Sequence, residues 1–192
     1  MPDPILPAEQ RDGFRFRGGH RALDLVATLA ARLKPAPRDL LAAPGDVERW
    51  LVAAGFASGV HATETDLLAA RRLREAIHDL AVARIAGKPD PAKARTDLNA
   101  VAAGPAAAPQ LDPTGALAWH GNAAGLLGEV AREAVLLLGG AQARHIRQCE
   151  AEGCAILFLD TSRSHDRRWC SMAACGNKAK VAEFRRRKRS AA

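Results

Sequence analysis

The stretch that organises this chain runs from Cys149 to Arg189 and reads CEAEGCAILFLDTSRSHDRRWCSMAACGNKAKVAEFRRRKR. It contains all four cysteines, in two pairs with four residues inside each pair and fifteen residues between them. Two close cysteine pairs on either side of a spacer can supply the four thiolates of a tetrahedral zinc site. We therefore predict a structural Zn²⁺ bound by Cys149, Cys154, Cys170 and Cys175, with no open coordination position. The alternative is a set of unrelated buried or redox-active thiols, which the paired spacing disfavours.

Lysines and arginines follow the second cysteine pair at helical spacing and form a predicted nucleic-acid-binding helix. The candidate contacts are Lys178, Lys180, Arg185, Arg186, Arg187, Lys188 and Arg189. A helix with a cationic face can lie against a duplex, and each phosphate that it neutralises makes the affinity fall more steeply with salt. We expect its apolar residues Val181 and Phe184 to pack back near Phe158. The alternative is a basic tail that makes only non-specific contacts.

The spacer arginines have two interpretations that the sequence leaves open. Arg167 and Arg168, together with Arg163, either contact phosphate or stabilise the zinc centre, whose four thiolates leave a formal charge of about −2. In the second case they could also pair with Asp160. Trp169, directly before a cysteine, is expected to cover the site by packing rather than to stack on bases.

Charge is distributed unevenly along the 192 residues, whose net charge is +7. From His145 onward there are 11 Lys or Arg against 5 Asp or Glu, whereas the preceding part has 17 against 16. This asymmetry indicates a polyanionic partner such as DNA. The start, MPDPILPAEQRDGF, has no signal-peptide pattern, and the most apolar run, Ala134–Leu138, is too short to span a bilayer. We expect a cytoplasmic protein with no membrane partner, in which reduced thiols favour metal binding.

The spacing of apolar residues predicts a mainly α fold with minor β content. We expect a flexible arm over residues 1–12, a short strand over 14–19, helices over 20–33, 44–54, 63–85, 92–102 and 122–139, and a hairpin that turns at 112–115. The charged side of the longest helix, including Arg74, should face solvent. A helical N-terminal domain with a small hairpin therefore spans residues 13–142. The C-terminal module, residues 145–192, should contain a β-hairpin over 145–160 and a helix capped by Asn177, in a treble-clef-like zinc finger.

Two resemblances agree with this division. RRWCSMAACGNKAK, from Arg167 to Lys180, resembles the CGNR zinc finger, although Lys178 stands where that family's signature has Arg. GHRALDLVATL, from Gly19 to Leu29, is similar to the opening pattern G-x-x-x-LDF-x-NT-L of the ABATE domain that usually precedes such a finger; Ala27 replaces the Asn. The resemblance implies a stress-induced bacterial transcription regulator that binds DNA.

Three classes of function can be weighed from these features. A DNA-binding transcription regulator is favoured, with the N-terminal domain as a sensor, a dimerisation domain or both; a homodimer and a small-molecule effector are candidate partners. The alternative is a zinc-stabilised protein- or RNA-interaction module without sequence-specific DNA binding. An enzyme is disfavoured, because the metal shell is closed and no paired catalytic groups occur. Arg17, His20 and Asp24 could line an effector pocket, but a surface histidine and an exposed ion pair are the favoured explanation.

Overall fold

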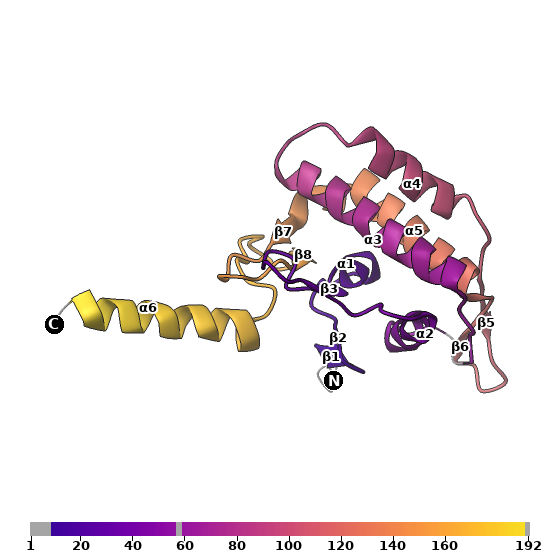
Figure 1. Cartoon of the computed structure of the whole chain (residues 1–192), viewed down its shortest axis with the longest axis horizontal. Helices are drawn as coiled ribbons and strands as arrows, with labels where there is room; N and C mark the ends of the chain where they lie inside the picture. The colour runs from indigo at the N-terminus through magenta and orange to yellow at the C-terminus, as the bar shows by residue number, and fades with distance from the viewer. Residues whose placement is uncertain (1–8, 57–58, 191–192) are drawn as a thin grey trace.

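The computed structural model describes residues 9–56 and 59–190, and its helices carry most of the fold (Figure 1). The helices are α1 (Arg21–Val26), α2 (Pro44–Ala53), α3 (Glu64–Ile85), α4 (Ala92–Ala102), α5 (Ala123–Gly139) and α6 (Asn177–Ser190), with a 3₁₀ turn at Ala141–His145 and a π turn at Met172–Gly176. The strands form four antiparallel pairs: β1 (Gln10–Arg11) with β2 (Phe14–Arg15), β3 (Leu29–Ala30) with β4 (Arg38–Asp39), β5 (Ala108–Leu111) with β6 (Leu117–His120), and β7 (Ile146–Gln148) with β8 (Leu157–Leu159). The fold is mainly α with minor β, as predicted.

Helices α3, α4 and α5 pack side by side, and α1 lies against α3 and α5 (Figure 1). Side-chain caps set the starts of two of these helices. Thr63 and Asp66 form a reciprocal capping box at the start of α3, and the Asn122 side chain accepts a hydrogen bond from the Gly125 N–H at the start of α5. The buried side chains of these helices form one continuous apolar core with Trp50 and Leu51 of α2. The predicted helices from residue 44 to residue 139 are thus confirmed.

The predicted helix over residues 20–33 is wrong in its second half. Helix α1 ends at Val26, and the Thr28 hydroxyl donates a hydrogen bond of 2.6 Å to the Leu25 carbonyl. The chain then enters the β3–β4 hairpin, and Ala31 adopts a φ of 56° that no helix allows. Leu33, which the helical pattern would have buried, is 61% exposed. Pairing between strands that lie apart in the sequence overrides the local helical periodicity.

Two further expectations need correction. The arm predicted over residues 1–12 lies outside the described residues up to residue 8, but Gln10 and Arg11 form strand β1 rather than a flexible segment. Arg74 does not face solvent: its side chain is 5% exposed, and its guanidinium donates to Asp39 at 2.6 and 3.0 Å and to Glu75 at 2.8 Å. A buried guanidinium is stable only with such partners, and these bonds tie the β3–β4 hairpin to α3.

Steric constraints explain why glycines occupy the two positions Gly18 and Gly19 before α1. A Cβ on Gly18 would lie 2.8 Å from the Cβ of Leu23 and 2.9 Å from Oδ1 of Asp24, and Gly19 has a φ of +67°. This close approach lets the Gly18 N–H donate to Asp24 at 2.7 Å, while the Gly18 carbonyl accepts a hydrogen bond from the Leu159 N–H at 2.8 Å. The segment therefore connects the first helix to the C-terminal hairpin.

The β7–β8 hairpin joins the C-terminal module to the helical core. Ile146, Leu157 and Leu159 belong to the same buried cluster as the helices, whereas Phe158 and Ile156 belong to a second cluster around the cysteines. The two faces of a strand carry alternate residues, so one short hairpin serves both clusters. The N-terminal domain and the zinc module are consequently packed together through a shared core.

Candidate metal centre and basic helix

The structure brings the four cysteines to one point. Their sulfur atoms all lie within 4.8 Å of one another. The Sγ of Cys154 lies 3.9 Å from that of Cys170 and 3.8 Å from that of Cys175, and Cys170 and Cys175 are 3.7 Å apart. Four sulfurs placed about 2.3 Å from a tetrahedral zinc ion would be separated by about 3.8 Å. A disulfide needs about 2.0 Å. The donor set therefore fits zinc, and the structure brings the four predicted cysteines together in one cluster.

Local turns place these sulfurs. In the first pair, Gly153 has a φ of +70°, and the Cys154 N–H donates to the Ala151 carbonyl at 2.9 Å. In the second pair, the N–H groups of Cys175 and Gly176 both donate to the Ser171 carbonyl. The Cys170 N–H also donates to the Sγ of Cys149 at 3.4 Å. This bond joins the two pairs directly.

The electrostatics of the cluster favour a bound cation. A hydrogen bond from the Cys170 thiol lowers the pKa of Cys154 to about 5. Donating that bond raises the pKa of Cys170, and burial raises the pKa of Cys175 to about 11. Like charges at these separations oppose one another, so four thiolates cannot coexist here without a compensating cation. Zinc, when bound, supplies that charge and cross-links the two pairs.

Arg167 is fixed inside the zinc module. Its Nε donates to the Trp169 carbonyl at 2.8 Å, a second guanidinium nitrogen donates to the Cys170 carbonyl, and the guanidinium lies 4.9 Å from the centre of the Phe158 ring. The Arg167 N–H donates to Asp160 at 2.8 Å. These contacts hold the second cysteine pair against β8, so the geometry favours the local role of Arg167 over phosphate contact.

Arg168 and Arg163 remain on the surface. Arg168 pairs with Glu150 at 2.6 Å with 62% of its side chain exposed, and Arg163 is exposed as well. Trp169 packs partly buried against the cysteine cluster, in line with its expected covering role.

Asp160 organises the spacer, a role that the sequence analysis did not assign to it. It is 1% exposed and accepts hydrogen bonds from the N–H and hydroxyl of Ser162 as well as from Arg167. Burial acts to raise its pKa, but these hydrogen bonds outweigh burial and hold the pKa of Asp160 below its usual range. The D-x-S spacing of Asp160 and Ser162 is typical of such a turn and could have indicated it from the sequence.

Helix α6 extends away from the rest of the molecule (Figure 1). Val181 is 49% exposed and Phe184 is 69% exposed, so the expected packing of these residues near Phe158 is wrong. Phe158 is instead covered by Arg167 and the cysteine cluster. Asn177 is not the N-cap either: it already has helical φ and ψ, and the Ser171 side chain caps the preceding π turn by accepting from Ala174 at 3.1 Å.

The predicted cationic contacts lie on this exposed helix. Lys178, Lys180, Arg185, Arg186, Arg187 and Lys188 are all exposed, and Arg189 lies in the last turn of the helix. Arg187 pairs with Glu183, the acidic residue of the helix. The structure therefore gathers the predicted basic residues on one projecting element, except for the spacer arginines.

The three candidate effector residues near α1 have different environments in the structure. His20 caps α1, its Nδ1 accepting from the Ala22 N–H at 3.3 Å. Arg17 pairs with Glu9 at 3.2 Å. Asp24 is buried at 6% exposure, so the favoured explanation of an exposed ion pair is wrong for this residue.

Comparison with known families agrees with this geometry. The sequence model of the ABATE family, described as "Putative stress-induced transcription regulator", matches residues 19–141. The model of the CGNR zinc finger matches residues 145–188. No curated protein matches the chain. Among the described residues, no helix is both long and apolar enough to cross a membrane.

Proposed function

The chain belongs to the ABATE family and carries a C-terminal CGNR zinc finger, and on this premise we propose that it is a DNA-binding transcription regulator. The observation that supports this best is helix α6. It begins directly after the π turn that holds Cys175, and the described side chains from Val181 to Lys188 are all exposed. The zinc centre thus fixes the N-terminal end of a cationic helix that remains accessible to a partner.

The dimensions and charge of α6 suit a duplex. Fourteen helical residues extend about 21 Å, and the major groove is about 12 Å wide, enough to admit a helix. Lys178, Arg185 and Arg189 fall on one side of the helix at its 3.6-residue period, and the other basic residues surround it. No Asn or Gln follows Asn177 in α6, so direct base recognition would depend on arginine contacts to guanine.

The N-terminal domain would supply sensing, dimerisation or both. The two matched families are described as a regulator and a zinc finger rather than as enzymes. A metal shell of four thiolates leaves no position for a substrate water, which supports a non-enzymatic role. A reduced thiolate centre also favours the cytoplasm as the place of action.

Selection of genomic DNA fragments by the purified, zinc-loaded protein tests this proposal. The selection is run at low salt and at near-physiological salt, because contacts to phosphate alone weaken steeply as salt rises. Enrichment of a defined site that survives the higher salt is expected. Uniform retention that disappears at the higher salt would contradict sequence-specific regulation.

The exposed apolar residues of α6 favour a second candidate function. Phe184 and Val181 could contact an apolar protein surface, and an exposed aromatic ring can also stack on an unpaired base. A protein- or RNA-interaction module would retain a protein or a single-stranded RNA in preference to duplex DNA. Competition between an RNA oligonucleotide and a duplex of equal length distinguishes these cases.

A further inference from the structure

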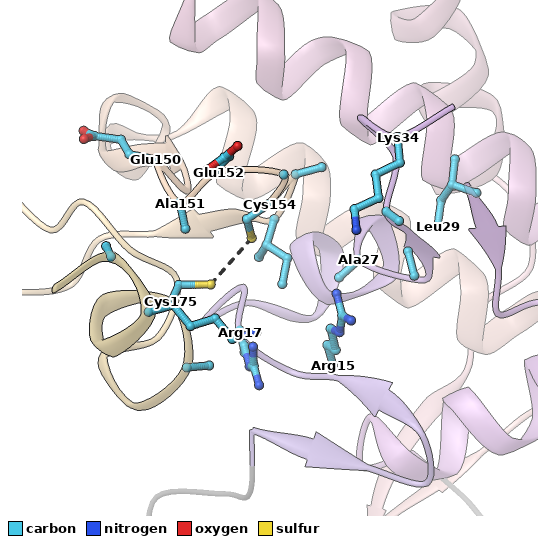
Figure 2. Close-up of a pocket in the computed structure, with 18 of the residues that line it drawn as sticks. Arg15, Arg17, Ala27, Leu29, Lys34, Glu150, Ala151, Glu152, Cys154 and Cys175 are labelled. Carbon is cyan, nitrogen blue, oxygen red and sulfur yellow. Dashed lines mark hydrogen bonds between the residues drawn. The ribbon is translucent and has the colours of Figure 1, made fainter. Parts of the chain in front are cut away.

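A cavity of about 530 Å³ lies between the N-terminal domain and the zinc module. One wall is formed by β2 and the β3–β4 hairpin, and the other by the two cysteine pairs and the first turn of α6 (Figure 2). The floor is small and apolar, with Val26, Ala27 and Ile156 among its residues. This volume lies within the range of about 300–1,000 Å³ that small-molecule sites occupy.

Cationic side chains line this cavity on both sides. Arg15 and Lys34 come from the N-terminal domain, and Lys178 comes from the start of α6. In Figure 2 the ammonium of Lys34 and the guanidinium of Arg15 point toward the same space from opposite directions. Within residues 9–56 and 59–190, these three side chains form no ion pair with an acidic group.

The carboxylates at the cavity offset only part of this charge. Glu150 is paired with Arg168 at 2.6 Å, and Figure 2 shows its carboxylate directed away from the cavity. Glu152 adds one negative charge to the lining. Arg17 adds another cation, which is paired with Glu9.

The position of Lys34 is built into the fold. The β3–β4 hairpin that carries it is fastened to α3 by Arg32, which donates to Glu75 at 2.5 Å, and by the Arg74–Asp39 pair. The aliphatic part of Lys34 then lies against the first cysteine pair, with its Cε 3.6 Å from the place where a Cβ on Gly153 would stand. Two ion pairs to α3 thus hold the hairpin that carries Lys34. This lysine has no acidic partner among the described residues and lies beside the first cysteine pair.

We propose that this cavity binds a small organic anion, with a carboxylate, phosphate or sulfonate group between Arg15, Lys34 and Lys178 and an apolar body on the alanine-rich floor. Bound there, the anion neutralises Lys178, which is also a proposed DNA contact. The ligand and DNA therefore compete for this residue, and occupancy weakens DNA binding. The competition rests on the proposed function, whereas the binding site itself does not.

The competing explanation is that the cations only balance the charge of the zinc centre, because Cys154 and Cys175 line the same cavity. The two explanations predict different results when these cations are replaced. If the cations serve the metal, their loss lowers zinc retention. If they serve a ligand, their loss lowers anion affinity while zinc remains bound.

Fluorescence titration of the zinc-loaded full chain with anilinonaphthalene sulfonate tests the site, because this probe joins a sulfonate to an aromatic body. Saturable binding at one site is expected, and Lys34→Glu should weaken it by about tenfold or more, since a charge-assisted contact becomes a repulsion. Ala179→Trp, which fills the cavity from α6, should also weaken it. The matched control is Lys88→Glu, an exposed lysine after α3, which should bind the probe as the wild type does.

Further measurements separate the outcomes. N-phenylnaphthylamine, the same aromatic body without the sulfonate, should bind markedly more weakly than the sulfonate. Equal affinity of the two probes, or wild-type affinity in both Lys34→Glu and Ala179→Trp, would overturn the proposal. So would loss of zinc from Lys34→Glu with unchanged probe affinity. A DNA duplex should displace the probe; failure of any duplex to bind the protein would contradict the proposed function while leaving the probe titration to decide the site.

Discussion

At the scale of single residues, Cys170 is the cysteine whose loss should matter most. It is 1% exposed, lies 3.7 and 3.9 Å from two of the other sulfurs, and its N–H reaches the third. We expect Cys170→Ser to lose zinc and to unfold the module, because small metal-bound domains depend on the metal for folding. Zinc content by atomic absorption and protease resistance measure this. The control is Thr161→Ser in the exposed spacer. Stoichiometric zinc and full resistance in Cys170→Ser would show that the four-cysteine assignment is wrong.

Asp24 gives a residue-scale prediction on pH. Burial raises the pKa of its carboxyl to about 7, although the Gly18 N–H acts in the opposite direction. The folded protein therefore binds a proton that the unfolded chain, with a carboxyl pKa of about 3.9, has already released. Stability due to this group is present at low pH and is lost as pH rises from about 4 to 7. We expect Asp24→Asn, which keeps the acceptor oxygen, to be more stable than the wild type by roughly 1–4 kcal/mol at pH 8, with the difference vanishing near pH 4. Urea unfolding at both pH values measures it; equal stability at pH 8 would contradict it.

At the scale of elements, the proposed DNA binding by α6 depends on the charge of this helix rather than on its packing against the rest of the protein. Its basic residues surround the helix with Glu183 as the acidic partner in it, and repulsion between neighbouring cations opposes a helix of this length. We expect replacement of Arg185–Arg189 by alanines to weaken duplex binding by about tenfold or more, with zinc retained. The slope of log affinity against log salt concentration should become shallower by about two to four. Fluorescence anisotropy over a salt series measures both. The control replaces Lys88, Lys93 and Arg95 by alanine, three exposed cations around the start of α4. An unchanged slope in the α6 variant would move the contact surface elsewhere, first to Arg168 and Arg163.

At the scale of the whole molecule, the two matched domains should unfold together. Ile146, Leu157 and Leu159 of the C-terminal hairpin complete the core that α1, α3 and α5 begin. Burial of three such side chains contributes on the order of 5 kcal/mol, which is comparable to the total stability of a small domain. We expect a chain that ends at residue 144 to lose its cooperative thermal transition. A chain that ends at Ala179 is the control, because the described side chains beyond that residue, from Lys180 to Lys188, are exposed, and it should melt within a few degrees of the full protein. A stable transition in the shorter chain would show that the N-terminal domain is independent.

The sequence by itself determined the features that depend on neighbours along the chain. Capping at Thr63 and Asn122, the turn at Asp112 and the extent of α3 follow from residues within a few positions of one another, and the structure bears them out. The zinc ligands could be predicted for a related reason, because four cysteines in two close pairs are typical of a structural metal site and of few other kinds of site. Only the tertiary structure decided the rest. Residues 27–33 could not be assigned correctly, because the pairing of β3 with β4 and the buried Arg74–Asp39 contact override an apolar spacing that is itself helical. Val181 and Phe184 carry an apolar pattern, but whether a surface meets that pattern depends on where the helix points. The cavity between the two domains is of the same kind: Arg15, Lys34 and Lys178 lie far apart in the sequence, and only the shared core brings them to one place.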